Sequence, residues 1–156
     1  MAYLDVITLA TAKNYLGIDD TLSEDDADIT RMIKGALRYV EEFTNVLVYA
    51  RDKDFLFQDK EVRVYDHPIN TLNTPVLATS TVKPLYTLYK TSLSTDIYLN
   101  LNVGYSDPLD VPEDIIDVAL EMIELNYYGE KERGAAKKGL SQLSKEVLYM
   151  NKRFLL

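Results

Sequence analysis

Residues 8–45, TLATAKNYLGIDDTLSEDDADITRMIKGALRYVEEFTN, decide how this chain begins to fold. Thr8 is a good helix N-cap because its hydroxyl can accept a hydrogen bond from the first turn, and Gly17 suits the end of the short helix that follows. A longer helix starts near Ser23 or Asp25, where acidic side chains favour the positive end of the helix dipole. Its apolar residues recur every three or four positions and so share one stripe: Ile29, Met32, Ile33, Ala36, Leu37, Val40 and Phe43. The stretch indicates a scaffold, because nothing in it is arranged for chemistry.

Composition limits the class of protein. A chain of 156 residues fits one domain, 1–156, with a core of ordinary size. Its 47% apolar and 27% charged residues exclude a disordered chain, and no apolar run approaches the roughly 18 residues of a spanning helix. The start of the chain lacks a signal peptide, so we expect synthesis and assembly in a cytoplasm. The absence of cysteine excludes disulfides and thiolate sites, and the 12 tyrosines favour assembly with other chains.

Charge is distributed unevenly along the chain. Residues 1–130 hold 10 basic and 23 acidic side chains, whereas residues 131–156 hold 7 basic and 2 acidic ones. An acidic body repels a phosphate backbone, so sequence-specific binding of nucleic acid by residues 1–130 is not expected. The basic segment suits an acidic partner, although a solvated basic loop at 131–138 remains the simpler interpretation of that run alone.

In the middle third of the chain, the spacing of apolar residues changes from every three or four positions to every second position. Near-alternation with β-branched and aromatic residues predicts about four short strands within 50–103, at residues 54–58, 61–65, 84–90 and 96–103. Turn-forming residues separate them at 66–68, 70–75 and 91–95. No repeat or change of composition divides the chain into further domains.

Two more helices follow the strand region. Pro112 and the acids behind it predict a helix over 112–128 that ends at Gly129 and is apolar over most of its circumference. A weaker helix is predicted over 140–150. With helices near 8–16 and 24–44, the expected fold is α+β: a small helical bundle with a β-rich insertion. The last residues mix large apolar groups with cations, which a chain end seldom does unless it docks on something.

No catalytic, cofactor-binding or metal-binding residues emerge from the sequence. The single histidine, His67, precedes a proline in a predicted turn and is expected to be structural. The glycines form no phosphate-binding loop, and the acidic run 19–28 lacks the central glycine of a calcium loop. An enzyme would require a buried pair such as Asp117 and Glu121, which lie one helical turn apart and are more simply a solvated strip.

Three segments together resemble the head-tail connector, or adaptor, family of tailed bacteriophages. They are TLATAKNYLGI at 8–18, DDADITRMIKGALRYVEEFTN at 25–45, and VGY at 103–105 followed by VPEDIIDVAL at 111–120. The likeness is best over residues 8–45 and 103–130, while the strand region matches only in order and length. No single motif is diagnostic; the order and separation of the three segments carry the resemblance.

The resemblance implies a structural virion protein rather than an enzyme. Such a protein forms a ring, expected to be dodecameric, between the portal and the stopper or tail-completion protein in the virion neck. Genomic DNA passes through it without sequence-specific binding, and no membrane or cofactor is implied. By analogy residues 131–156 form a basic C-terminal helix and docking tail whose contacts with the portal are Lys145, Tyr149, Asn151, Lys152, Arg153 and Phe154.

Two alternatives stay open at this stage. In the first, the C-terminal residues pack against their own domain instead of a portal. In the second, the whole chain is an acidic inhibitor or regulatory module, whose carboxylates mimic DNA or bind a basic partner. That reading needs Asp and Glu spread over an exposed face, whereas many of them here lie at helix starts.

Overall fold

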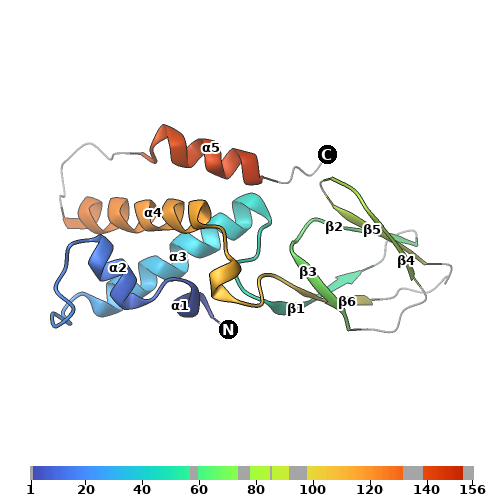
Figure 1. Ribbon diagram of the computed structural model, residues 1–156, viewed down its shortest axis with the longest axis horizontal. Helices are drawn as coiled ribbons and strands as arrows, with labels where there is room; N and C mark the ends of the chain where they lie inside the picture. Colours follow the sequence, from blue (N-terminus) through green and yellow to red (C-terminus); the bar gives the residue numbers. More distant parts are fainter. Residues whose placement is uncertain are drawn as a thin grey trace.

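The computed structural model describes residues 2–56, 60–73, 78–84, 86–91, 98–131 and 139–152. In these residues, five α-helices gather at one end of the molecule and two small antiparallel sheets at the other (Figure 1). This arrangement confirms the α+β class and the bundle with a β-rich insertion. No helix of the described part is long and apolar enough to cross a membrane.

The bundle is built around α4, with α3 packed along one side of it and α5 along another (Figure 1). Short helices α1 and α2 contact α3, and α2 also contacts α4. The bounds are α1 (Tyr3–Val6), α2 (Leu9–Tyr15), α3 (Asp26–Thr44), α4 (Glu113–Lys131) and α5 (Gln142–Asn151), with a 3-10 turn, η1 (Pro108–Asp110), before α4. All four predicted helices are therefore present, and the central position of α4 explains why it is apolar on several sides.

Local signals at the helix ends behave as predicted in the first half of the chain. The Thr8 hydroxyl accepts a hydrogen bond from the Thr11 amide at 3.0 Å, and Gly17 adopts a φ of 67°. Six of the seven stripe residues of α3 are buried, while Phe43 is half-buried. The prediction that α4 ends at Gly129 is wrong, since the helix continues to Lys131. Glycine ends a helix where the chain turns left-handed, and Gly129 does not.

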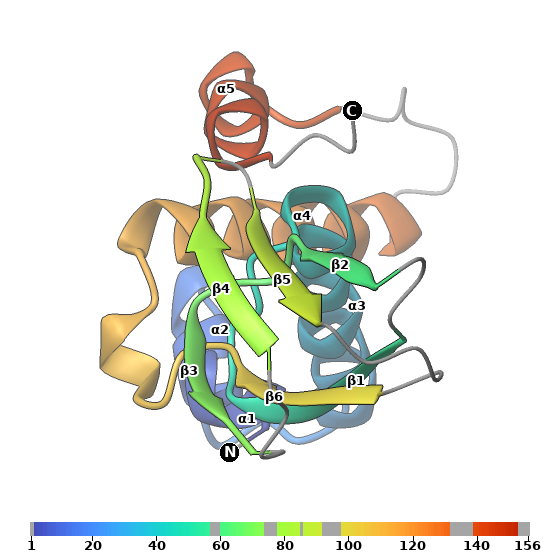
Figure 2. The ribbon, with the colours of Figure 1, turned by 90° about the vertical axis from the view of Figure 1, so that its right-hand side faces the viewer.

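In the part of the chain that the structure describes, six strands form two three-stranded sheets. The first has the order β1 (Arg51–Leu56), β6 (Tyr98–Val103), β3 (Ile69–Leu72), and the second β2 (Glu61–Val64), β5 (Thr87–Thr91), β4 (Ala78–Val82). Every pair is antiparallel. Figure 2 looks at this end of the molecule, where β4 and β5 lie farthest from the helices.

Two of these strands are additional to the four expected. β3 and β4 fall in segments that the sequence marks as turn-rich or polar, and their described side chains are exposed or half-buried. Each lies at the edge of its sheet. Ile69 of β3 packs against the smaller core, but the other described residues of the two strands are exposed, so no apolar alternation is present for period-2 patterning to detect.

Two hydrophobic cores hold the fold together. The larger one joins the helices, and the smaller lies between the sheets around Leu47, Val64, Tyr89, Leu99, Leu101 and Val103. The opposite face of the first sheet is polar: side-chain amides and carboxylates bond to one another across β1, β6 and β3. These side chains are Asp52, Asp54, Asn70, Asn73, Asn100 and Asn102.

A buried carboxylate connects the two ends of the molecule. Glu41 of α3 is 4% exposed and accepts hydrogen bonds from the Tyr3 hydroxyl at 2.7 Å, the Val48 amide at 2.9 Å and the Arg51 guanidinium at 2.8 and 3.1 Å. Burial, together with the bond to Glu41 and its negative charge, raises the pKa of Tyr3 to about 12. The guanidinium also lies 4.7 Å from the centre of the Tyr49 ring. α1, α3 and β1 are thus fixed to one another by a single side chain.

Candidate functional site

Helix α5 contains Lys145, Tyr149 and Asn151 of the predicted partner-binding residues, and hydrogen bonds to Glu121 hold its first turn. Ser141 is the N-cap, and its hydroxyl accepts a bond from the Ser144 amide at 3.1 Å. Glu121 of α4 accepts bonds from the Ser141 amide at 2.5 Å, the Ser141 hydroxyl at 2.9 Å and the Ser144 hydroxyl. Burial alone would raise the pKa of Glu121, but these bonds outweigh it and the pKa is lowered.

Apolar contacts hold the rest of α5. Val147 and Leu148 are buried in the helical core, and Leu140, just before the helix, packs against that core. Leu143 and Met150 point away from the bundle and are 70% and 75% exposed. The helix is therefore attached through a narrow face and presents most of its circumference to the outside.

Near its C-terminal end α5 meets α3 in a small aromatic group, which we name the Phe43 cluster: Tyr39, Phe43, Tyr149 and Lys152. The Phe43 ring centre lies 6.0 Å from that of Tyr39, nearly parallel, and 5.5 Å from that of Tyr149, edge to face. The Lys152 ammonium nitrogen lies 4.3 Å from the Phe43 ring centre. A cation over an aromatic face is attracted by the ring quadrupole, so the cluster fastens the end of α5 to α3.

The six predicted partner-binding residues divide into three groups. Lys145 and Tyr149 are four positions apart in α5 and share one face of the helix, and Lys152 directly follows the helix with its ammonium over the Phe43 ring. Asn151 donates a hydrogen bond to the Val147 carbonyl at 3.0 Å and belongs to another face. Arg153 and Phe154 lie outside the described residues, as do 132–138 of the basic segment.

The structure adds members of this surface that the sequence did not indicate. Tyr39 and Phe43 come from α3, and Phe43 carries the whole cluster, although its spacing alone places it on the buried stripe of that helix. In the sequence, Phe43 differs from the other stripe residues only by being the last of them, one turn beyond Val40. Tyr149 is 59% exposed and Lys145 is exposed, so this face of α5 is accessible despite the contacts with α3.

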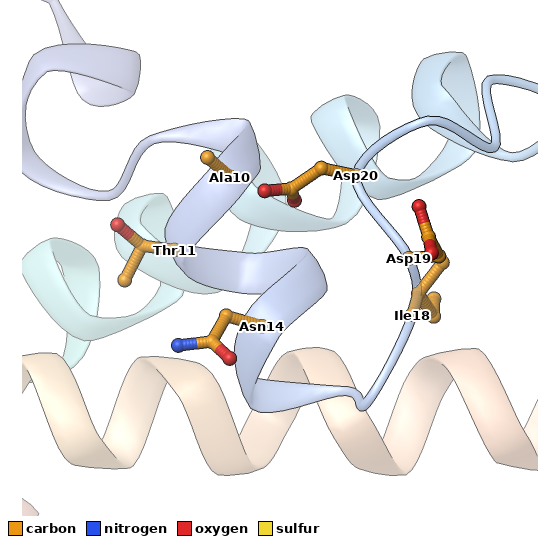
Figure 3. A pocket seen from close by; sticks show the side chains of 6 residues that line it. All are labelled: Ala10, Thr11, Asn14, Ile18, Asp19 and Asp20. Atoms are coloured by element: carbon orange, nitrogen blue, oxygen red, sulfur yellow. The ribbon is translucent and has the colours of Figure 1, made fainter.

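A shallow depression of about 570 Å³ lies between α2 and the loop after it (Figure 3). Its lining is Ala10, Thr11, Asn14, Ile18, Asp19 and Asp20. The Asp19 carboxylate accepts bonds from the hydroxyl and amide of Thr21 at 2.6 and 2.8 Å, and these bonds lower its pKa. A lowered pKa makes a carboxyl a poor general acid or base near neutral pH. The depression therefore offers acceptors to solvent but no paired groups for catalysis.

The other carboxylates considered in the sequence form no catalytic pair, and several of them have structural partners. Asp117 is exposed and Glu121 is occupied by Ser141 and Ser144, so the two do not form the buried pair that an enzyme would need. At the start of α3, Asp25 accepts a bond from the Tyr127 hydroxyl at 2.6 Å, and Asp26 pairs with Lys13 at 2.9 Å. Among the described residues, no group of three or more metal-ligating side chains gathers.

Lys13 holds the acidic loop between α2 and α3 in place. Its side chain is 3% exposed, and its ammonium donates to the Asp20 carbonyl at 3.0 Å, the Leu22 carbonyl at 2.5 Å and the Asp26 carboxylate at 2.9 Å. A buried cation needs such partners, since desolvation of an unpaired charge is costly. Lys13 of α2 therefore connects that helix to the acidic loop and to the first turn of α3.

Comparison with known proteins finds likeness at the level of fold. No family model and no curated protein matches the chain. Its fold is similar to that of a chain in the neck of an empty gene transfer agent particle, a structure computed with C6 symmetry. The TM-score is 0.78 with 13% sequence identity, over 100% of this chain and 94% of that one. A chain in the virion of a native gene transfer agent particle matches with a TM-score of 0.72 and 11% identity, over 97% and 91%.

Proposed function

We propose that this protein is a structural component of a phage-like particle, forming a ring in the neck between the portal and the stopper or tail. The observation that carries the proposal is the fold likeness to a neck component over the full length of the chain. It agrees with the independent resemblance of residues 8–45 and 103–130 to head-tail adaptors. In this proposal 1–156 is one adaptor domain, located in the virion after assembly in the host cytoplasm.

The proposed ring is dodecameric. A twelve-membered ring contains a six-fold axis, so this copy number is compatible with the C6 symmetry of the neck that the chain resembles. A closed ring of identical subunits needs a heterologous contact, in which two different surfaces of the chain meet.

The acidic body supports a conduit for DNA. The chain has a net charge of −8, and a wall of this sign makes few phosphate contacts, which would otherwise retain the DNA in a salt-dependent way. The genome then passes through the ring without sequence-specific binding. No catalysis is needed for this role.

The proposed contact with the portal uses the accessible face of α5 that carries Lys145 and Tyr149, together with Lys152 just after the helix. Asn151, Arg153 and Phe154 complete the predicted set. Many copies docking at once would bind tightly even if each contact were weak. Carboxylates such as Asp26, Glu41 and Glu121 are bonded within the molecule, whereas Asp19 and Glu24 are among many that are exposed. The acidic inhibitor alternative rests on those exposed acids.

The test measures the mass of the protein by light scattering behind a sizing column, alone and mixed with the portal protein of the same particle. We expect a defined ring on the portal. Lys145→Glu should abolish the complex while leaving the circular dichroism spectrum intact, since this side chain is exposed and lies outside the Phe43 cluster. Lys34→Glu, which changes an exposed lysine of α3, is the matched control and should bind normally.

Two results would refute the proposal in different ways. A chain that never joins the portal at any concentration contradicts the neck role and favours the inhibitor alternative. A ring that forms equally well with the α5 variant retains the neck role but moves the portal contact to another surface.

A further inference from the structure

The segment from His67 to Thr95 differs from the rest of the chain in charge. It contains no aspartate or glutamate, although the protein has 25 of them, and its charged residues are Lys83 and Lys90. Its described part comprises β3, β4 and β5. Two copies of a chain with net charge −8 repel each other, and this repulsion is smallest where one copy presents a surface without acids.

Within this segment, β4 is an edge strand without the usual protection. In the described residues it pairs with β5 alone, and the register between them is continuous. The sequence of the strand, ATSTV, has no charge, no proline and no bulge, and residues 79–82 are all exposed, Val82 by 81%. Natural sheets usually block such edges with those features, because an open edge accepts another strand.

The register shows which backbone groups of β4 face outward. The Lys83 amide donates to the Tyr86 carbonyl at 2.9 Å, so this facing pair is hydrogen-bonded. Bonded and non-bonded pairs alternate in an antiparallel ladder, which directs Thr79 and Thr81 toward β5. The amides and carbonyls of Ala78, Ser80 and Val82 then point to the open edge.

The same argument applies to β2, the opposite edge of this sheet. The Thr91 amide donates to the Lys60 carbonyl at 2.9 Å, so the alternation directs the backbone of Glu61 and Arg63 away from β5. Because β5 is antiparallel to both of its neighbours, β2 and β4 run in the same direction.

We propose that β4 of one subunit pairs with β2 of the next, so that the second sheet continues from copy to copy around the ring. The inference rests on the proposed ring and names its interface. A heterologous contact needs two different surfaces, and the two edges of one sheet supply them. Rotation about an axis roughly along the strands preserves their direction, so the new pair is parallel. Backbone hydrogen bonds provide the contact, as in other cases of strand addition.

Engineered cysteines test the contact directly, because the native chain has none. The pairing of Val62 with the buried Tyr89 puts Arg63 on the outer face of the sheet, and Thr79 and Thr81 lie on that same face. We expect Arg63→Cys combined with Thr81→Cys, or with Thr79→Cys to allow for register, to form a ladder of disulfide-linked subunits when the portal-bound ring is oxidised. Each single variant is the control and should give no ladder.

A backbone substitution provides the second test. Ser80→Pro removes an amide that faces the open edge without removing a bond to β5, a change that edge strands tolerate. We expect it to weaken ring formation at least tenfold, measured as the concentration at which half the protein is assembled on the portal. Ser80→Val keeps the amide and should assemble like the native chain. Equal thermal melting of the two variants verifies that both are folded.

The outcomes separate this inference from the neck role. If the ring forms but no cysteine pair cross-links and Ser80→Pro assembles normally, the β4 contact is wrong and the ring proposal stands. A covalent dimer from Thr81→Cys alone would mean that β4 meets β4 about a two-fold axis, which also overturns the inference. Failure of the native chain to form any ring would overturn both.

Discussion

Replacing Glu41 by alanine should be among the most damaging single changes to this fold. The substitution leaves the buried Val48 amide without an acceptor and removes both bonds to the Arg51 guanidinium. An orphaned buried donor costs ~1–3 kcal/mol. Breaking a fully buried ion pair costs ~3–5 kcal/mol. Because the Arg51 side chain is 29% exposed and regains water, the lower end applies, and we expect a loss of ~3 kcal/mol.

The assay is reversible thermal and urea unfolding followed by circular dichroism. For a chain of this size a loss of ~3 kcal/mol lowers Tm by ~6–12 °C. Glu42→Ala is the matched control. The Glu42 carboxylate pairs with Arg38 at 2.8 Å, but the Glu42 and Arg38 side chains are 65% and 71% exposed. An exposed pair one turn apart is worth ~0.3–0.5 kcal/mol, so Glu42→Ala should change Tm by no more than a degree or two.

A double-mutant cycle checks the reasoning further. Tyr3→Phe should cost ~1 kcal/mol in the native chain, the typical value of one hydrogen bond, and almost nothing once Glu41 is alanine. Equal stability of Glu41→Ala and Glu42→Ala would refute the argument, since it would mean that burial of Glu41 and the number of its bonds do not matter.

Three further predictions concern pH, the attachment of α5 and the backbone. Because the pKa of Tyr3 is raised from 10.0 to about 12, the stability that its protonated hydroxyl contributes is complete below pH 10 and is lost as the pH rises to 12; urea unfolding of Tyr3→Phe should lack this part of the alkaline loss. Glu121→Gln should speed amide hydrogen exchange across α5 while leaving α3 protected, and Asp117→Asn on the same strip should not. In the native chain the pKa of Glu121 is lowered, so its contribution is present above pH 4.5 and is lost on acidification below it. Equal protection of the α5 amides at pH 7 and pH 3, each relative to the intrinsic exchange rate at that pH, would contradict this. Gly104→Ala should lower the stability by at least ~3 kcal/mol, because φ is 110° and the new Cβ would lie 2.2 Å from the Tyr49 carbonyl oxygen. Gly35→Ala, with open space around it in α3, should instead raise the stability by ~0.5–1 kcal/mol. The Tm values of the two variants test both expectations.

Much of the candidate site follows from helical spacing. Lys145 and Tyr149 share a face as soon as α5 is a helix, and the apolar pattern of 140–150 predicts that helix. The attachment of Tyr149 and Lys152 to α3 was not predictable, since it depends on Phe43 lying next to α5 in space. Side chains more than 100 positions apart in sequence give no periodic signal of their contact.

The sequence by itself determined the helices α2 to α5, though not the short α1, and also the four strands with apolar alternation, the Thr8 cap and the left-handed Gly17. Each is a local property, because hydrophobic period and capping act within a few residues. Only the tertiary structure decided that Lys13 and Glu41 are buried, since a charge enters the core only where other segments bring it partners. It also decided the edge strands β3 and β4, whose polar residues are stabilised by backbone bonds to β6 and β5 and not by burial of their own side chains. Those bonds depend on which strand arrives alongside, and no local pattern encodes that.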